Sequence, residues 1–360
     1  MSIIPFDREK EMQVTGYTAQ YLSYYGTTLP PMRKLNKPIT SRENVLRVYR
    51  HEEPMWVPSC IEDMNLLQPL CMPDAQARNY GGIDWFGIEW EYEPKSNAAM
   101  VKPGTRRMKD ILTWKEELTF PDLGAIDWQG YYDENYAGKL DPDKATEFVI
   151  VNGCMERLAD LSSFEDALSW LLIEPEAVGE LFEKFTDFHI ELARIAHDIF
   201  HADIITFHDD LGTQRSPFIS KSVFEEVLLP HYRRMNDAIH AMGMYTNFHS
   251  CGNVDLLLDG YVDAGFDSWE GQDNANDKAA QMQRLGDKLI HHTNFFLTEV
   301  VSDEELDRIL RENIETIGCK GRYISFFMPQ VPDLEFMMKA YDRFYELGRE
   351  YYTKKYNGEG

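Results

Sequence analysis

The segment His249-Ser250-Cys251-Gly252 contains a histidine and a cysteine, two residue types that can bind metal ions and take part in catalysis. A short run with β-branched and aromatic residues, YTNFH, is typical of a strand and leads into this segment. Alternate residues of a strand point the same way, so His249 and Cys251 could bind one ion. Zinc accepts imidazole and thiolate ligands, and a catalytic zinc site uses three protein ligands with one position open. The alternative is that this His and Cys only pack in the core.

A second cluster, His208-Asp209-Asp210, also follows an apolar strand-like run. Adjacent carboxylates repel, so one of them can keep a raised pKa and act as an acid. They could instead position a ligand through hydrogen bonds. A simpler alternative is an acidic helix N-terminus, which the helix dipole stabilises. Because the strand leads straight into the cluster, we favour a functional role.

The elements that must position these residues alternate regularly through the last two thirds of the chain. β-branched and aromatic runs predict strands at 55–60, 147–152, 203–208, 245–249, 266–270, 289–294 and 322–327. Amphipathic periodicity predicts helices at 175–200, 221–243, 254–264, 275–285, 303–317 and 333–355. Capping boxes are expected at Ser162, Ser222 and Ser302. This alternation predicts a parallel sheet, and so many units favour a closed (β/α)8 TIM barrel, in the α/β class, over an open sheet.

In such a barrel the active site lies at the C-terminal ends of the strands. No glycine-rich dinucleotide loop follows any strand, which argues against a Rossmann fold. Besides the two clusters above, the residues expected at strand ends are Cys60, Glu62, Asp63, Asn152, Cys154, Glu270, Gln272, Asn294, Phe296, Met328 and Gln330. The pair His291-His292 lies inside a strand, so its rings should point to opposite faces.

The chain is expected to form one domain over residues 1–360, with an N-terminal extension at about 1–38 and an insertion at about 81–145. The insertion holds four of the seven tryptophans. Long excursions of this kind often cover a barrel mouth, but a structural cap on the barrel side is an equal alternative.

Composition narrows the class of protein. The 61 acidic residues against 36 Lys and Arg give a net charge of −25, which disfavours nucleic acid as a partner. The five cysteines are few and irregularly spaced, which favours a reducing compartment, so we expect a cytoplasmic protein. The sequence shows neither a secretory signal nor an apolar run of membrane-spanning length, so no membrane association is expected.

Four stretches resemble the uroporphyrinogen decarboxylase superfamily, in its corrinoid-dependent methyltransferase branch. They are ITSRENVLRVYRHEEPMWVPS, FHDDLGTQRSPFISKSVFEEVLLPHYRRM, NFHSCGNVDLLLDGYVDAGFD and GFDSWEGQDNAND, and the similarity spans most of residues 39–345. The family fold is a (β/α)8 barrel. The resemblance implies methyl transfer to or from cobalt in a separate corrinoid-binding protein, with a small-molecule methyl donor.

Branch members that methylate a thiol hold zinc with His, Cys and a later Cys. His249 and Cys251 match the first two, but the later position falls in Phe326-Phe327-Met328-Pro329-Gln330. The third ligand could be Glu62, His208 or Glu270, and we assign Glu270. The missing cysteine favours transfer from a donor, such as a methoxylated aromatic, to cobalt(I), as in O-demethylases. The departing oxygen then needs a Lewis acid or a protonated acid.

The resemblance leads to three groups of predicted site residues. Asp210, Glu62 and His208 are expected to be catalytic, and Asn152, Asp209, Gln272 and Gln330 to contact substrate. His249, Cys251 and Glu270 are expected to bind a metal ion, with zinc as the candidate. The alternatives are zinc-dependent methyl transfer to a thiol or folate, tetrapyrrole decarboxylation, and a binding module without catalysis. Decarboxylation is the minor alternative, because PPMRKLNKPIT offers only Arg33, Lys34 and Lys37 for a polycarboxylate substrate.

Overall fold

Seven parallel strands form the centre of the molecule in the computed structural model, which describes residues 3–95 and 98–358. The sheet order is β12-β11-β10-β9-β8-β7-β3. The strands are β3 (Met64–Leu67), β7 (Ala145–Ile150), β8 (Ile204–His208), β9 (Tyr245–Ser250), β10 (Ser268–Gly271), β11 (Ile290–Leu297) and β12 (Tyr323–Pro329). The sheet curls so far that Ser59, just before β3, bridges Ser325 of β12 in a parallel sense. The (β/α)8 barrel-like fold is therefore confirmed.

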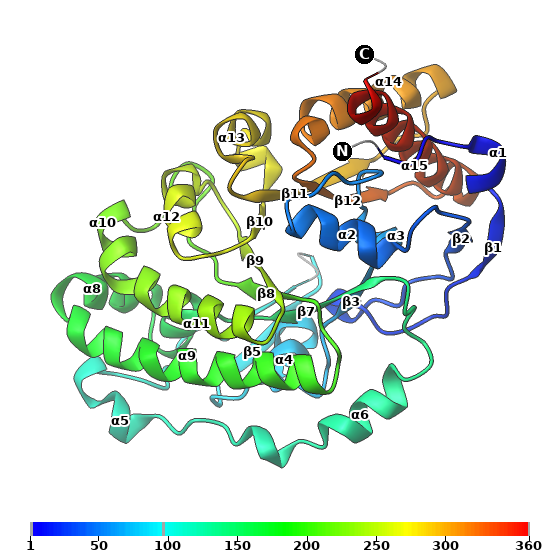
Figure 1. Ribbon diagram of the computed structural model, residues 1–360. Helices are drawn as coiled ribbons and strands as arrows, with labels where there is room; N and C mark the ends of the chain where they lie inside the picture. The colour runs from blue at the N-terminus through cyan, green and yellow to red at the C-terminus, as the bar shows by residue number, and fades with distance from the viewer. Residues whose placement is uncertain (1–2, 96–97, 359–360) are drawn as a thin grey trace.

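Helices surround the curled sheet on its outer side (Figure 1). They are α2 (Ser41–Tyr49), α3 (Cys60–Asp63), α4 (Pro73–Tyr80), α7 (Cys154–Leu161), α8 (Phe164–Ile173), α9 (Pro175–Asp198), α10 (Lys221–Val223), α11 (Leu229–Ala241), α12 (Leu258–Asp263), α13 (Lys278–Leu285), α14 (Asp303–Thr316) and α15 (Leu334–Asn357). A π-helical turn, Phe224–Leu228, joins α10 to α11 immediately before Pro230. Proline has no N–H to continue the α-helical hydrogen bonds, which accounts for an irregularity at this point.

The N-terminal region adds α1 (Arg8–Glu11), β1 (Val14–Tyr17) and β2 (Arg33–Leu35), and β1 pairs antiparallel with β2. Its first described residue is tied to the far end of the chain. The Ile3 N–H donates to Asn357 Oδ1 and the Asn357 amide donates back to the Ile3 carbonyl. Arg349 of α15, fully buried, is paired with Glu11 of α1. The N-terminal segment therefore packs against the last helix.

The predicted first strand at 55–60 is wrong. Only Ser59 makes a strand-type bridge there, and the chain turns through α3 before β3 begins at Met64. Two prolines, Pro54 and Pro58, lack the N–H groups that a ladder needs. The α3 turn is held by Asp63, which accepts hydrogen bonds from the Ser59 N–H and the Trp56 indole. The remaining predicted strands differ from those observed by at most three residues at either end.

One of the three predicted serine N-caps is present in the structure. The cap predicted at Ser302 is confirmed, because its hydroxyl accepts the Glu305 N–H. The other two predicted caps are wrong. Ser163 accepts from Asp166 at the start of α8, and Ser220 accepts from Val223 at the start of α10. In each case another nearby serine supplies the hydroxyl.

The excursion after α4 forms its own small elements. They are the antiparallel strands β4 (Gly82–Ile83), β5 (Glu89–Glu93) and β6 (Ala98–Val101), and the helices α5 (Trp114–Glu117) and α6 (Trp128–Asn135). The rings of Trp85 and Phe86 contact Phe188 of α9, and Trp128 contacts Phe200 just beyond that helix. Figure 1 shows α5 and α6 running alongside α9. These contacts favour the structural cap over the barrel side.

Two buried histidines give the fold a pH-dependent stability. Burial lowers the pKa of His189 and of His291 to about 3, so both are neutral in the folded protein near pH 7. An unfolded chain takes up a proton on each ring as the pH falls below about 6.5. The two neutral histidines therefore add to the free energy of unfolding above pH 6.5. This contribution decreases as the pH falls towards 3.

We expect the free energy of unfolding to fall less steeply with decreasing pH in His291→Leu than in the parent protein. Linkage gives roughly 2 kcal/mol for one such histidine between pH 7.5 and pH 5. Urea unfolding at several pH values measures the slope, with exposed His197→Leu as the control. An unchanged slope in the His291 variant would contradict this assignment.

Candidate metal and active site

Two histidines lie side by side where β8 and β9 end. His208 and His249 are directly paired in the register of the two strands. Their rings stack with centroids 4.1 Å apart and planes 11° from parallel. The two motifs, far apart in the chain, therefore bring two imidazoles to one point at the C-terminal edge of the sheet.

The far nitrogen of each ring is fixed by a carboxylate. His208 Nδ1 donates to Glu156 Oε2 at 2.8 Å, and His249 Nδ1 donates to Glu270 Oε1 at 2.7 Å. Because a carboxylate accepts the Nδ1 proton of each ring, the Nε2 lone pair on the opposite side of the ring is available to bind a metal ion. Metal-binding histidines are commonly oriented by a carboxylate in this way.

Asp210 lies opposite both free nitrogens. Its Oδ1 is 4.0 Å from His208 Nε2 and 3.9 Å from His249 Nε2. Cys251 Sγ lies 3.6 Å from His249 Nε2, and the Cys251 N–H donates to Asp210 Oδ1 at 2.6 Å. His208, Asp210 and His249 have ligand atoms that all lie within 4.8 Å of one another. The donor set fits a divalent metal ion of the zinc type, with Cys251 within reach as a further ligand.

The electrostatic surroundings also favour a cation here. Burial on its own lowers the pKa of His249, but its bonds to Cys251 and Glu270 raise that pKa well above the ordinary value. Burial likewise opposes charge on Glu156 and Glu270, yet Arg78 with His208, and His249 with His292, lower their pKa values. A site that favours a proton on Nε2 also favours a metal ion there.

The cluster is reachable from outside. The side chain of Asp210 is 28% exposed, whereas that of His208 is 10% exposed. Two glycines bring the motif loops together, because a Cβ on Gly252 would collide with the backbone of Gly212. Gly252 also has a φ of 81°, which favours glycine. The glycines of both motifs therefore serve the close approach of the two loops.

Glu270 and Asp209 take supporting positions. Glu270, predicted to bind metal, lies behind His249 and also within 3.6 Å of His292 Nδ1. Asp209, predicted to contact substrate, is fully buried and accepts hydrogen bonds from Tyr232 and from two N–H groups at the start of α7. Burial raises the pKa of Asp209 to about 7. Asp209 therefore holds α7 in place beside the cluster.

The predicted amide contacts differ in their surroundings. Asn152 contacts Arg78: the Arg78 guanidinium donates a hydrogen bond to Asn152 Oδ1 at 2.5 Å. Gln272 accepts the Gly252 N–H at 3.1 Å and thus steadies the His-Ser-Cys-Gly loop. Gln330 is exposed beyond β12. Asn152 and Gln272 therefore belong to the surroundings of the cluster.

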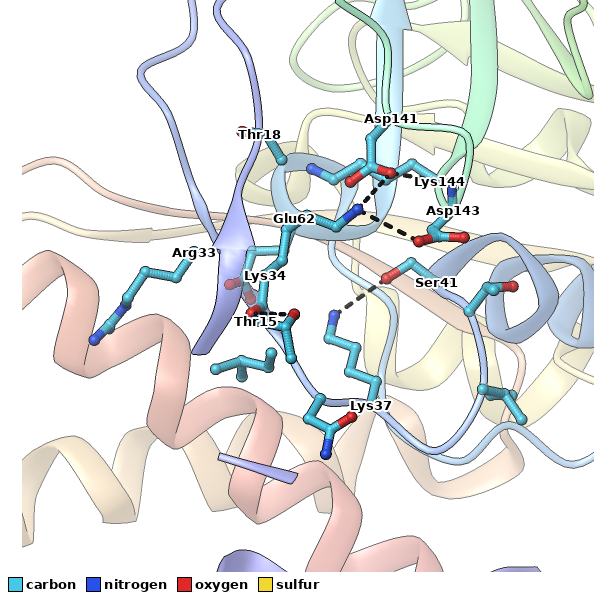
Figure 2. Close-up of a pocket in the computed structure, with 14 residues that line it drawn as sticks. Thr15, Thr18, Arg33, Lys34, Lys37, Ser41, Glu62, Asp141, Asp143 and Lys144 are labelled. Carbon is cyan, nitrogen blue, oxygen red and sulfur yellow. Dashed lines mark hydrogen bonds and ion pairs between the residues drawn. The ribbon is translucent and has the colours of Figure 1, made fainter. Parts of the chain in front are cut away.

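Glu62 is not brought to this cluster. It lies on α3, before β3, in a separate cavity with Asp141 and Lys144, which precede β7 (Figure 2). Those residues mark the N-terminal ends of strands, away from His249. The misplacement follows from the interrupted first strand, because α3 takes the place of the strand end on which the prediction relied.

Glu156 and Arg78 contact the cluster or its partners, and the sequence patterns did not predict either of them. Glu156 lies in the first turn of α7, and Arg78 of α4 donates to it at 2.9 Å. The one available signal was an acidic residue shortly after Cys154, beyond the end of β7. Arg78 has no such signal, because its contact with α7 spans 78 residues of chain.

We expect Glu156→Gln to weaken metal binding by about 10–100-fold, the usual cost of losing a partner behind a ligand. The amide keeps the shape but lacks the charge that supports His208. Titration with zinc against a chelator measures the affinity, and exposed Glu165→Gln is the matched control. An affinity within twofold of the parent protein would show that Glu156 does not orient a ligand.

Comparison with known proteins agrees with this architecture. The family model for uroporphyrinogen decarboxylase (URO-D) matches residues 148–326, which include β7 to most of β12 and both histidines. The predicted resemblance to the uroporphyrinogen decarboxylase superfamily is therefore confirmed over this part of the chain.

A solved methyltransferase from Methanosarcina mazei shares the fold with a TM-score of 0.59 at 14% identity, over 86% of this chain and 98% of that one. A sugar phosphate isomerase/epimerase from Parabacteroides distasonis has a TM-score of 0.33 at 12% identity, over 56% and 85% of the two chains. D-psicose 3-epimerase from Clostridium cellulolyticum has a TM-score of 0.32 at 10% identity, over 60% and 78%. The last two similarities are too low to inform fold or activity. No curated protein sequence matches the chain.

In the part of the chain that the structure describes, every helix is too short or too polar to cross a bilayer.

Proposed function

We propose that this protein is a methyltransferase that moves a methyl group from a small methoxylated donor to the cobalt of a separate corrinoid-binding protein. The observation that carries the proposal is the convergence of His208 Nε2, His249 Nε2 and Asp210 on one point at the barrel mouth. In this proposal the 360 residues act as one barrel domain.

The reaction is a nucleophilic displacement. Cobalt(I) attacks the methyl carbon, a Co–C bond forms, and the C–O bond breaks with its electron pair going to oxygen. The oxygen leaves as an alkoxide or phenolate and later takes a proton from water. A bound divalent metal would supply Lewis acidity for that oxygen.

The chain's own residues have defined tasks in this proposal. His208, His249 and Asp210 would hold the metal, with Cys251 as a further ligand within reach. Glu156 and Glu270 accept the Nδ1 protons, so that the Nε2 lone pairs of both rings would be available to hold the metal. Asp210 is the exposed member of the set and therefore faces incoming substrate.

The methyl-acceptor alternatives have less support. Thiol activation in the family uses a second cysteine, and the end of β12 carries Phe326 and Met328 instead. Tetrapyrrole decarboxylation needs free cations for several carboxylates. Arg33, Lys34 and Lys37 of the N-terminal region line a cavity that lies apart from the histidine cluster, so they are not available to a substrate at the barrel mouth.

The decisive experiment incubates the protein with a reduced corrinoid protein and a panel of methoxybenzenes. Conversion of the cobalt(I) absorption spectrum to that of methyl-cobalt is the expected result. No conversion with any donor would refute the donor reaction. Methyl-cobalt demethylated by a thiol in the presence of this protein would instead support the acceptor alternative.

A further inference from the structure

A second polar cavity lies apart from the histidine cluster, between the N-terminal segment, α2, α3 and the residues that precede β7. Its volume is about 320 Å³. Four basic side chains line it, although the chain carries a net charge of −25: Arg33, Lys34, Lys37 and Lys144. Figure 2 shows Lys34 directed at Asp141 and Asp143, and Lys37 at Ser41. Such a concentration of cations in an acidic protein calls for a physical reason.

The three lysines keep hydrogen-bonding capacity. An ammonium group has three donors. Lys34 uses two, on Asp141 and Asp143, and Lys37 uses two, on Asp63 and Ser41. Lys144 donates to the Ile61 carbonyl at 3.2 Å, and within the described residues no carboxylate lies within ion-pair distance of it. Each lysine can therefore donate to a ligand in the cavity.

The cavity is also lined by Thr40 and Ser41, at the N-terminus of α2. A helix N-terminus carries partial positive charge, which adds to that of the lysines. Burial lowers the pKa of Lys144 to about 8, and Asp63 and Glu62 oppose that fall. An anion in the cavity would restore a full charge on Lys144.

Glu62 is the one acidic lining residue for which the described part of the structure shows no side-chain hydrogen bond or ion pair. Burial raises the pKa of Glu62 to about 7; Lys37 and Lys144 limit the rise, whereas the nearby carboxylates of Asp63 and Asp342 add to it. A neutral Glu62 has an O–H to donate to an anion, whereas an ionised Glu62 repels one.

We propose that this cavity binds a small oxyanion, a phosphate, sulfate or carboxylate group, held by Lys34, Lys37 and Lys144, with Glu62 as a further contact. The site is separate from the histidine cluster and does not depend on the methyl-transfer proposal. Binding takes up a proton on Glu62 when the protein starts in its ionised form.

Sulfate is a suitable probe, because its charge stays constant between pH 6 and pH 8. Calorimetric titration at fixed ionic strength, with chloride as the reference salt, is expected to show binding that weakens by roughly 20-fold from pH 6 to pH 8, about tenfold as Glu62 ionises and about twofold as Lys144 loses its proton. Glu62→Gln should remove most of that pH dependence, leaving about a twofold loss from Lys144 deprotonation. Succinate in place of sulfate distinguishes a carboxylate ligand from a tetrahedral one.

Lys144→Gln should weaken sulfate binding at least tenfold, and the same change at exposed Lys288 should leave it within twofold. At pH 8, Glu62→Gln is expected to strengthen sulfate binding and Lys144→Gln to weaken it. A general loss of folding cannot produce these opposite changes in affinity. Equal thermal stabilisation by sulfate, succinate and chloride would overturn the proposal. Unchanged binding in Lys144→Gln would do the same.

Discussion

His249→Ala is expected to abolish methyl transfer and to remove tightly bound metal from the protein. The ring supplies one of the two nitrogens that face Asp210, and it is held in place by Glu270 at 2.7 Å. Lewis-acid stabilisation of a leaving oxygen is worth several kcal/mol, so we expect a loss of roughly 10³-fold or more in kcat/KM. Corrinoid methylation measures the rate, and elemental analysis of dialysed protein measures the metal.

A histidine elsewhere provides the matched control. His197 of α9, with 43% of its side chain exposed, carries the same ring away from the cluster. His197→Ala should keep both rate and metal content. If His249→Ala retained a full equivalent of metal, the ligand set would be wrong. Retained metal with a lost rate would instead assign His249 to substrate or proton handling.

The second large effect is on stability. Arg157 of α7 is buried and paired with two buried carboxylates, Asp74 of α4 and Asp84 of the excursion. It also stacks over the ring of Phe86, 4.7 Å from the centroid. Arg157→Met leaves two buried carboxylates without their cation. Breaking a buried ion pair by removing one partner costs about 3–5 kcal/mol.

Urea unfolding measures this loss. Arg194→Met on the surface of α9 is the control, because Arg194 is 53% exposed and its pair with Glu191 contributes at most about 1 kcal/mol. Adding Asp74→Asn and Asp84→Asn to Arg157→Met should recover part of the stability, since the carboxylate charges are then gone. A loss below about 1 kcal/mol for Arg157→Met would mean that water reaches the two carboxylates.

The ion pairs of Arg157 also bear on the site. Arg157 follows Glu156, the residue that holds His208, and Asp74 lies on α4 with Arg78. The pair and its neighbours therefore join α4 to α7 on the side of the histidine cluster. Stability and metal affinity should fall together in Arg157→Met, whereas His249→Ala should lower metal affinity and methyl transfer without a comparable loss of stability in the metal-free protein.

The sequence by itself determined the barrel class and the two clusters at strand ends. Strand and helix periodicities are local, so the runs before His208 and His249 were sufficient to place both residues at C-terminal ends. The family resemblance, carried by continuous stretches of sequence, pointed to the superfamily that the comparisons confirm.

Only the tertiary structure decided which of these residues meet. The register of β8 against β9 makes His208 and His249 direct neighbours. Glu270 contacts the Nδ1 side of His249, away from the Nε2 atom that faces Asp210. Glu156 and Arg78 reach the cluster through contacts between α7 and α4 that no local pattern encodes. Glu62 lies elsewhere because two prolines and α3 interrupt the first strand. Periodicity depends on neighbours along the chain, whereas a site depends on packing between segments that are distant in sequence.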